Sequence, residues 1–257
     1  MLRALIHRLP LPVRRAAGRI RDLVARAAYA VTGRPAGWLK YTDAHAYWNG
    51  RPMMAEELRD GAHSSPLQNA SREVFFNEFA RQPSRLALDA GCGYGKELRA
   101  MGARFPAVKT IGVDFSFNQL QDAKRYFPSS AGRLVQASLT ALPFRDDAFD
   151  ATYSTSVLNT IQENLSQGAF DELSRVTRGR ILHREVVRQH LVTAGRKQLV
   201  ASFDLAPHMF SHNYANEYRR RGREVARLEP LAPYRDQSPG PGEELWYSLI
   251  VVNPKTR

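Results

Sequence analysis

A glycine-rich turn between an apolar segment and a candidate helix is the part of the sequence best suited to chemistry. Asp89 stands near the end of the apolar segment, and Gly91, Gly93 and Gly95 follow it at alternating positions. Glycine lets the backbone turn sharply and approach a ligand closely, and the start of the next helix offers unpaired N–H groups. Asp114 ends a second apolar segment 25 positions after Asp89, where an acid can accept both hydroxyls of a ribose. The spacing predicts a site for a nucleoside ligand that also carries a cationic group.

The spacing of the glycines separates two classes of cofactor. A dinucleotide site requires G-x-G-x-x-G, whose third glycine would fall at the position that Lys96 occupies. The pattern in this chain is Asp-x-Gly-x-Gly-x-Gly. A carboxylate just before the turn would sit badly beside a pyrophosphate, whereas it would sit well beside the amino group of a methionine-type cofactor. We therefore expect the second class of cofactor.

Four further segments carry a resemblance to a known family. They are LVQAS at 134–138, ALPF followed by FD within 141–150, YSTSVLN at 153–159, and residues 168–184 with ELSRV and GRIL. With the glycine turn they cover about residues 85–187, in matching order and spacing. Over this region the chain resembles the class I S-adenosylmethionine-dependent methyltransferases. The resemblance implies that S-adenosyl-L-methionine is the cofactor.

The elements that position these residues alternate between strands and helices. Strands are expected at about 85–90, 109–114, 133–137, 149–154 and 180–187, with helices at about 95–105 and 116–126. Such alternation predicts a parallel sheet with helices on both faces, whose ligands bind beyond the carboxyl ends of the strands. The resemblance implies a Rossmann-like, doubly wound α/β fold of seven strands. The segment LWYSLIVV at 245–252 would be its last strand, inserted antiparallel.

The resemblance also implies a role for each site residue. Asp89 would lie near the ammonium of the methionine portion, the Ser154 carbonyl would approach that portion, and the glycine turn (Gly91, Cys92, Gly93 and Gly95) would surround it. Asp114 would hold the ribose. Phe115 would pack on the adenine face, and Ser138 and Leu139 would meet the adenine edge. Two residues depart from the family pattern. Ser138 stands where the family usually has Asp, and Gln119 where it often has Met or Leu. Both departures suggest looser cofactor binding.

Methyl transfer from a sulfonium requires alignment and exclusion of water, and a general base only when the acceptor must lose a proton. For that base the candidates are His208 and His212, which flank an apolar segment near the expected substrate side. No sequence spacing supports a metal site. The ALPF…FD segment indicates a small-molecule or lipid acceptor with an oxygen or carbon nucleophile. The alternatives are an acceptor on RNA or protein, suggested by the basic run 219–223, and a cofactor-binding partner protein without catalysis.

The charge of the chain is concentrated at its amino terminus. The whole sequence has a formal net charge of +12, and residues 1–40 hold nine Lys or Arg and one acid. A basic amphipathic helix is expected at 11–33, with three readings: packing on the catalytic domain, peripheral contact with an anionic membrane or a partner, or a presequence. Because the remainder is only mildly basic, nucleic acid is not the favoured partner.

Composition sets the remaining limits. The 257 residues, 43% hydrophobic, suffice for one large α/β domain with appendages, and we expect a basic extension at 1–40, a lid or cap at 41–84 and the methyltransferase domain at 85–257. Tyr41, Tyr47 and Trp48 are expected in the lid, by resemblance. Cys92 is the single cysteine, so no internal disulfide can form. The expected location is cytoplasmic, with membrane-peripheral attachment as a variant.

Overall fold

The computed structural model describes residues 48–50, 66–161, 163–188, 210, 212–233 and 245–255. Its helices are α5 (Pro66–Ala80), α6 (Lys96–Arg104), α7 (Phe117–Tyr126), α8 (Glu163–Val176) and α10 (Tyr214–Arg219), with 3-10 turns η1 (Pro128–Arg133) and η2 (Leu158–Thr160). Its strands are β1 (Leu86–Ala90), β2 (Lys109–Asp114), β3 (Leu134–Gln136), β4 (Phe149–Thr155), β5 (Thr177–Arg188), β6 (Val225–Pro233) and β7 (Leu245–Val252). The expected strands and helices are therefore confirmed to within a few residues.

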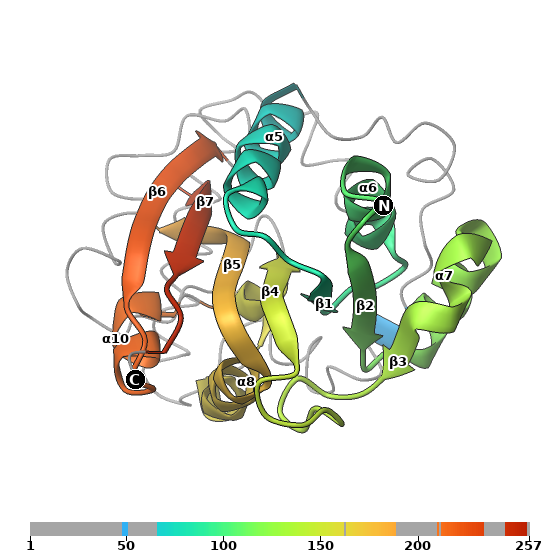
Figure 1. Cartoon of the computed structure of the whole chain (residues 1–257). Coiled ribbons are helices and arrows are strands. Elements are labelled where there is room, and N and C mark those ends of the chain that lie inside the picture. Colours follow the sequence, from blue (N-terminus) through green and yellow to red (C-terminus); the bar gives the residue numbers. More distant parts are fainter. Residues whose placement is uncertain are drawn as a thin grey trace, which may run out of the picture.

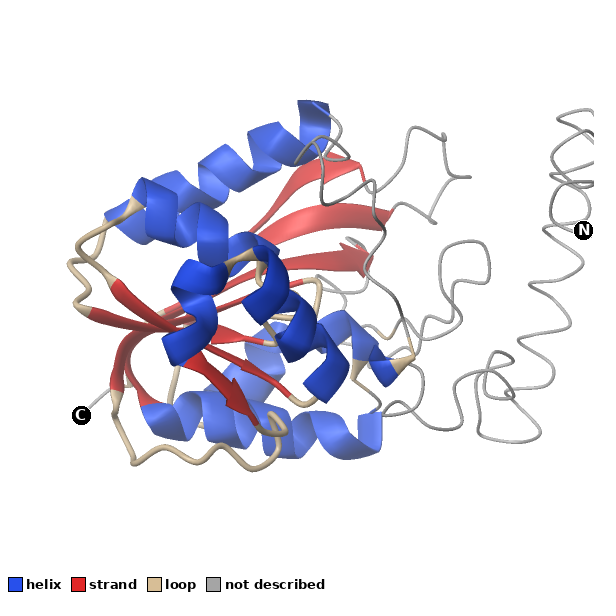
Figure 2. Ribbon diagram, turned by 90° about the vertical axis from the view of Figure 1, so that its right-hand side faces the viewer, coloured by secondary structure: helices blue, strands red, loops and turns tan. Residues whose placement is uncertain are grey.

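The strands form one sheet in the order β3-β2-β1-β4-β5-β7-β6 (Figure 1). From β3 to β5 every pairing is parallel, whereas β7 runs antiparallel to both β5 and β6. Helices cover both faces of the sheet (Figure 2). This is the seven-stranded, doubly wound arrangement with an antiparallel last strand that the sequence predicted.

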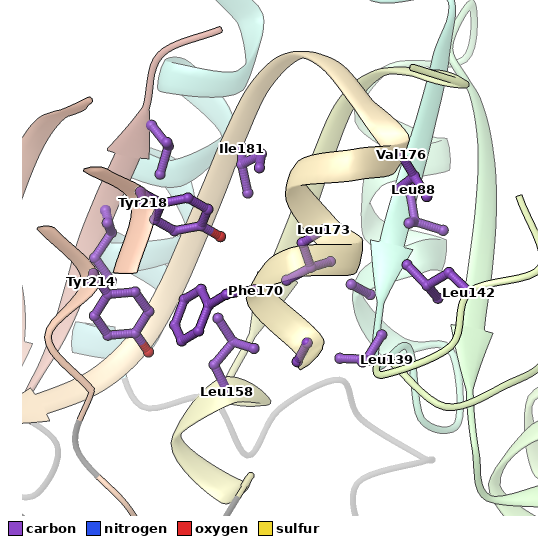
Figure 3. Close-up of a cluster of buried hydrophobic side chains, with 14 of the residues drawn as sticks. Leu88, Leu139, Leu142, Leu158, Phe170, Leu173, Val176, Ile181, Tyr214 and Tyr218 are labelled. Carbon is purple, nitrogen blue, oxygen red and sulfur yellow. The ribbon is translucent and has the colours of Figure 1, made fainter. Parts of the chain in front are cut away.

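Alternate strand residues supply two separate cores, because successive side chains of a strand point to opposite faces. Leu88 and Ile181 belong to the core that the strands share with α8 and α10, and Figure 3 shows them around Phe170 and Leu173. On the other face, Leu182 joins a core that contains the phenylalanines of α5 (Phe75, Phe76 and Phe79). The two cores hold the sheet from both sides and fix the strand ends in space.

The sequence did not reveal strand β6. The short helix α10 ends at Arg219, and β6 starts at Val225. Pro230 and Pro233 weaken any strand pattern, and proline is confined to edge strands because it cannot donate to a ladder. In this sheet β6 is the edge strand, pairs only with β7, and its register shifts between Pro230 and Ala232.

Asp150 joins the beginnings of three strands. One carboxylate oxygen accepts the backbone N–H groups of Arg85 and Leu86 at 2.8 and 2.9 Å, and the other pairs with the Arg178 guanidinium. Burial raises the pKa of Asp150, but these hydrogen bonds outweigh burial and the net pKa is lowered. Asp150 therefore ties β1 and β4 to β5 at the edge away from the glycine turn, which is a structural task.

Replacing Asp150 with Ala should lower the free energy of unfolding by about 1–3 kcal/mol, because two backbone donors and Arg178 lose a charged acceptor. Urea denaturation at pH 7 measures the loss. The stability difference between variant and wild type should shrink as the pH falls below 3.8, the ordinary pKa of the carboxyl. A carboxyl with a lowered pKa stabilises the folded state fully only above its ordinary pKa. The control is Asp171→Ala, which removes an exposed ion pair with Arg221 and should cost under about 1 kcal/mol. Equal losses in the two variants would contradict this assignment.

Candidate active site at the carboxyl ends of the parallel strands

The glycine turn closes back onto the neighbouring strand. The N–H groups of Gly91 and Cys92 both donate to the carbonyl of Val113 on β2, at 2.8 and 2.9 Å. Gly91, Gly93 and Gly95 have φ values of 76°, 51° and 86°, in the left-handed region that favours glycine. A Cβ on Gly91 would lie 2.4 Å from a methyl carbon of Val157 in the segment that follows β4. Val157 therefore packs directly against the backbone of the turn at Gly91.

Asp114, at the end of β2, organises the same turn. Its Oδ2 accepts the N–H of Gly93 at 2.9 Å and its Oδ1 accepts the N–H of Ser116 at 2.8 Å. Burial raises the pKa of Asp114, and the N–H groups of Ser116, Gly93 and Phe115 act to lower it. A carboxylate has about four acceptor positions and these N–H groups occupy three, so Asp114 keeps acceptor capacity for a ligand hydroxyl. Phe115 follows directly and is half-buried.

Asp89 is the most isolated charge of the site. Asp89 is 2% exposed, and its Oδ2 has no hydrogen-bond partner among the described residues. Burial raises the pKa of Asp89 well above the ordinary value; Glu97 raises it further, Tyr153 lowers it, and Asp114 raises it. Tyr153 is its register partner on β4. The carboxylate thus lies between two other acids with no cation among the groups that shift its pKa.

Glu97 is a site residue that the sequence did not reveal. It lies in the first turn of α6, and two arginines from distant elements converge on it. Arg72 of α5 donates from Nη2 to Glu97 Oε1 at 2.9 Å, and Arg184 of β5 reaches the same oxygen at 3.2 Å. Arg184 also lies over the Tyr247 ring. The arginines therefore compensate Glu97 and not Asp89, and nothing local in the sequence signals this choice.

The residues expected at the adenine edge lie beyond the end of β3. Leu139 is buried, whereas Ser138 is exposed and its hydroxyl bonds to that of Thr140 at 2.8 Å. Gln119 of α7 is buried, and its Oε1 lies 3.7 Å from where a Cβ on Gly93 would be. Gln119 therefore borders the glycine turn, at the place where the resemblance puts a residue flanking the adenine.

Cys92 packs inside the turn. It is 8% exposed, and a Cβ added to Gly112 would lie 2.8 Å from its sulfur. Burial raises the pKa of the Cys92 thiol well above its ordinary value, and Asp89 and Asp114 raise it further. Its side chain fills space between the turn and β2, so its part in a cofactor site is to support the backbone.

Ser154 lies in a buried chain of hydrogen bonds that joins β4, β5 and α10. Its hydroxyl donates to Oε1 of Glu185 at 2.6 Å and lies 2.8 Å from Nδ1 of His183, whose Nε2 is 2.6 Å from the hydroxyl of Tyr218. The one proton of Ser154 points to Glu185, so Nδ1 of His183 donates and Nε2 accepts from Tyr218. Burial lowers the pKa of His183 to about 3, which keeps the ring neutral.

The role of Glu185 was not anticipated, although the sequence held a signal. Residues 181–187 of β5 read ILHREVV, with three ionisable residues in a strand that the topology buries. Buried charge is found where it is hydrogen-bonded, so this run marks a polar network at the carboxyl end of β5. Glu185 is 0% exposed.

Of the two candidate bases, His208 lies outside the described residues. His212 is 8% exposed, and its Nε2 is 2.7 Å from the carbonyl oxygen of Leu158, so in the neutral ring Nε2 donates. The ring also contacts Phe170 and Tyr214 edge-on. A catalytic role for His212 stays a prediction.

A short part of the expected lid is described. The hydroxyl of Ser116 lies 2.8 Å from Oδ1 of Asn49 and 3.4 Å from the carbonyl of Trp48, and Asn118 donates to the carbonyl of Asn49 at 2.8 Å. Trp48 and Asn49 therefore lie against the start of α7, beside Asp114. Tyr41 and Tyr47, and the basic segment 11–33 with its predicted membrane contact, lie outside the described residues.

Half of the basic run 219–223 turns inward. Arg223 is 2% exposed and donates to the carbonyls of Gly179, Thr177 and other residues at the junction of α8 and β5. Arg221 pairs with Asp171 and Glu217. Only Arg219 and Arg220 remain exposed, so the run does not form a continuous basic surface.

No helix in the described ranges has the length and hydropathy needed to cross a membrane. Within the same ranges, no three His, Cys, Asp or Glu side chains gather as a set of metal ligands.

Comparison with known proteins identifies the region that carries the turn. The family described as "Methyltransferase domain" matches residues 88–180. A trans-aconitate 2-methyltransferase of Methylobacterium radiotolerans is 38% identical over 80 residues, 31% of this chain and 30% of that protein. A ubiquinone/menaquinone biosynthesis C-methyltransferase of Syntrophotalea carbinolica is 35% identical over 100 residues, 37% of this chain and 41% of that protein. The chain thus spans well under half the length of these curated relatives.

Among solved structures, the fold is similar to that of geranyl diphosphate C-methyltransferase from Streptomyces coelicolor, in complex with S-adenosyl-L-homocysteine. The TM-score is 0.62 at 17% identity, covering 83% of this chain and 97% of that one. The matched family region runs from β1 to the start of β5, across the strands whose ends carry the glycine turn and both acids, so this part of the chain is similar to methyltransferase domains.

Proposed function

We propose that the protein transfers the methyl group of S-adenosyl-L-methionine to a small-molecule acceptor. The observation that carries this proposal is Asp89, a buried carboxylate at the tip of β1 with an unpartnered oxygen among the described residues. Such a group is costly unless a cation pairs with it. An amino acid ammonium is a cation that would meet it at the turn.

The residues around Asp89 fit the rest of the cofactor. Asp114 lies one strand away, its carboxylate is oriented by the Gly93 and Ser116 contacts, and its remaining acceptor capacity suits a ribose hydroxyl. The backbone of Gly91 and Gly93 carries no Cβ, so the methionine portion can lie against it. Leu139 and Gln119 border the adenine side, where the exposed Ser138 gives a weaker acceptor than the family's usual carboxylate.

When bound, the cofactor supplies an activated methyl on a sulfonium whose leaving group is neutral. The protein's part is then to align acceptor and methyl group and to exclude water. Asp89 would hold the methionine ammonium and Asp114 the ribose, and the turn after β4 supports the glycine turn from the side of Val157. If the acceptor loses a proton, His212 or His208 is our candidate to take it.

A small-molecule acceptor is favoured over RNA or protein. The relatives named above act, by their names, on trans-aconitate, quinone precursors and geranyl diphosphate. Arg221 and Arg223, which could have contributed to a basic surface, are engaged within the fold. We further propose an oxygen or carbon nucleophile, with a lipid as one kind of acceptor. Incubating cell extract with radiolabelled cofactor and the purified protein would identify the acceptor.

The wild-type protein should bind S-adenosylmethionine and S-adenosylhomocysteine in calorimetric titrations. Asp114→Ala should weaken both by at least about tenfold, because the ribose hydroxyls lose charged acceptors and Gly93 loses its anchor. The matched control is Asp122→Ala, an acid of α7 with no resolved role at the turn, which should leave affinity unchanged. A dissociation constant of ~1 mM would be far weaker than ordinary cofactor affinities. If the wild type shows no binding at that cofactor concentration, the proposed function fails.

The Asp89→Asn variant should gain stability without ligand and lose affinity for the cofactor. The raised pKa means that ionisation of Asp89 favours the unfolded state: the penalty is complete above the raised pKa, shrinks as the pH falls from there, and is gone below 3.8, the ordinary pKa of the carboxyl. The variant without ligand should therefore be more stable at pH 7, by about 0.5–2 kcal/mol. Its affinity for S-adenosylhomocysteine should fall, because the ammonium loses its counter-charge.

Thermal unfolding with and without ligand, at pH 7 and at acidic pH, checks both halves of this prediction. The stability difference between variant and wild type should shrink toward acidic pH. A variant that is less stable without ligand, yet binds as tightly as the wild type, would show that Asp89 is a structural residue and does not meet the cofactor.

A further inference from the structure

The turn that follows β4, residues 156–160, is held from three sides. Ser156 has a φ of 55°, which is strained for a residue with a Cβ and persists only where the surroundings impose it. Behind the turn lies Glu185 of β5. Its carboxylate accepts the N–H of Val157 at 3.0 and 3.1 Å, and that of Asn159 at 3.3 Å. Together with the Ser154 hydroxyl, these donors satisfy a charge that is wholly buried.

The opposite side of the turn faces the cofactor loop. A Cβ on Gly91 would come within 2.4 and 2.7 Å of the two methyl carbons of Val157, so the valine side chain lies directly against the Gly91 backbone. Any displacement of Val157 must therefore move the glycine turn or open a gap beside it, because packed groups do not deform continuously.

The carbonyl groups of the same turn bind a third segment. Nε2 of His212 is 2.7 Å from the oxygen of Leu158, and the N–H of Phe210 donates to the oxygen of Asn159 at 2.6 Å. This segment includes the candidate base. The turn is thus shared by the cofactor loop on one side and by Phe210 and His212 on another, while Glu185 fixes it from within the sheet.

We propose that Glu185 is a positioning residue, which sets cofactor affinity by fixing the turn at 156–160 against Gly91. The inference rests on the proposed function, since the ligand is the cofactor named there. Glu185 touches neither cofactor nor acceptor. It acts through the Val157 N–H and the contact of Val157 with Gly91, so its loss should leave the sheet intact and the cofactor loop poorly held.

A carboxylate is suited to this task because its two oxygens can accept several hydrogen bonds at once. In Glu185→Gln one of these oxygens is replaced by an amide nitrogen, which is a donor and would oppose the N–H of Val157 or reverse the Ser154 contact. The variant keeps the size of the side chain and removes a buried charge whose pKa burial already raises. Its fold should therefore persist while the turn relaxes.

The test compares wild type, Glu185→Gln and Glu185→Ala in the full chain. Calorimetry with S-adenosylhomocysteine should give a dissociation constant raised about tenfold in Glu185→Gln and further in Glu185→Ala, since binding must now restore the turn. Hydrogen exchange without ligand should become faster in residues 154–161 and stay unchanged in β1 and β2. The unfolding midpoint of Glu185→Gln should not fall below that of the wild type.

Glu217→Gln is the matched control, because Glu217 is also a buried carboxylate but pairs with Arg221, remote from the turn. It should lower the unfolding midpoint and leave the dissociation constant unchanged. If both Glu185 variants bind as the wild type does, or if exchange rises across the whole sheet, Glu185 is only structural and the inference fails. Absence of binding by the wild type would instead refute the proposed function.

Discussion

The rest of the site depends on one buried carboxylate, Asp89, for which the part of the chain that the structure describes supplies no counter-charge. The two arginines that enter this region, Arg72 and Arg184, both bind Glu97. Asp114, on the next strand, adds a further negative charge near Asp89. Burying an unpaired charge costs stability, so such an arrangement persists where a ligand repays it. The fold tolerates this loss of stability because β1 pairs with β2 and β4 and is packed by the two cores, whatever occupies the site.

Asp89 and Asp114 reach the same edge because β1 and β2 are parallel neighbours, with Asp89 in register with Gly112. Their spacing is then set by the sheet and not by loops. The glycine turn lies between them, tied to Val113 on one side and packed on Val157 on the other. A rigid frame of this kind lets a ligand bind with little loss of conformational entropy, because its contacts are already in place.

Much of this arrangement could be predicted from the sequence, and the reason is local. Apolar strands end at Asp89 and Asp114, helices stop near Pro106 and Pro128, and glycine at alternating positions signals the turn, so periodicity and punctuation suffice. Glu97 and Glu185 could not be assigned in the same way. Their partners, Arg72, Arg184 and Ser154, are 25 or more residues away, and only the folded sheet brings them together.

Strand β6 and the run 219–223 are further cases in which contacts between distant parts of the chain could not be predicted from the sequence. Arg223 looks like part of a solvated basic cluster, yet it binds the carbonyls at the end of α8 and the start of β5. Its role depends on β7, whose insertion between β5 and β6 brings the carboxyl-terminal strands back against the parallel half of the sheet. Arg223 also donates to the carbonyl of Asn253, directly after β7.

Elements from different parts of the chain meet at the turn after β4, and this shapes how catalysis would work. Strands β1 and β2 and the loop between them supply Gly91 and the two acids, while β5 supplies Glu185 and α10 supplies Tyr218 at the far end of the same hydrogen-bond chain. Methyl transfer is sensitive to small errors in alignment between acceptor and donor. A turn that contacts the cofactor loop through Val157, and Phe210 and His212 through its carbonyls, would keep both in register. The carboxylate of Glu185 is therefore placed where one residue can influence both sides of the reaction.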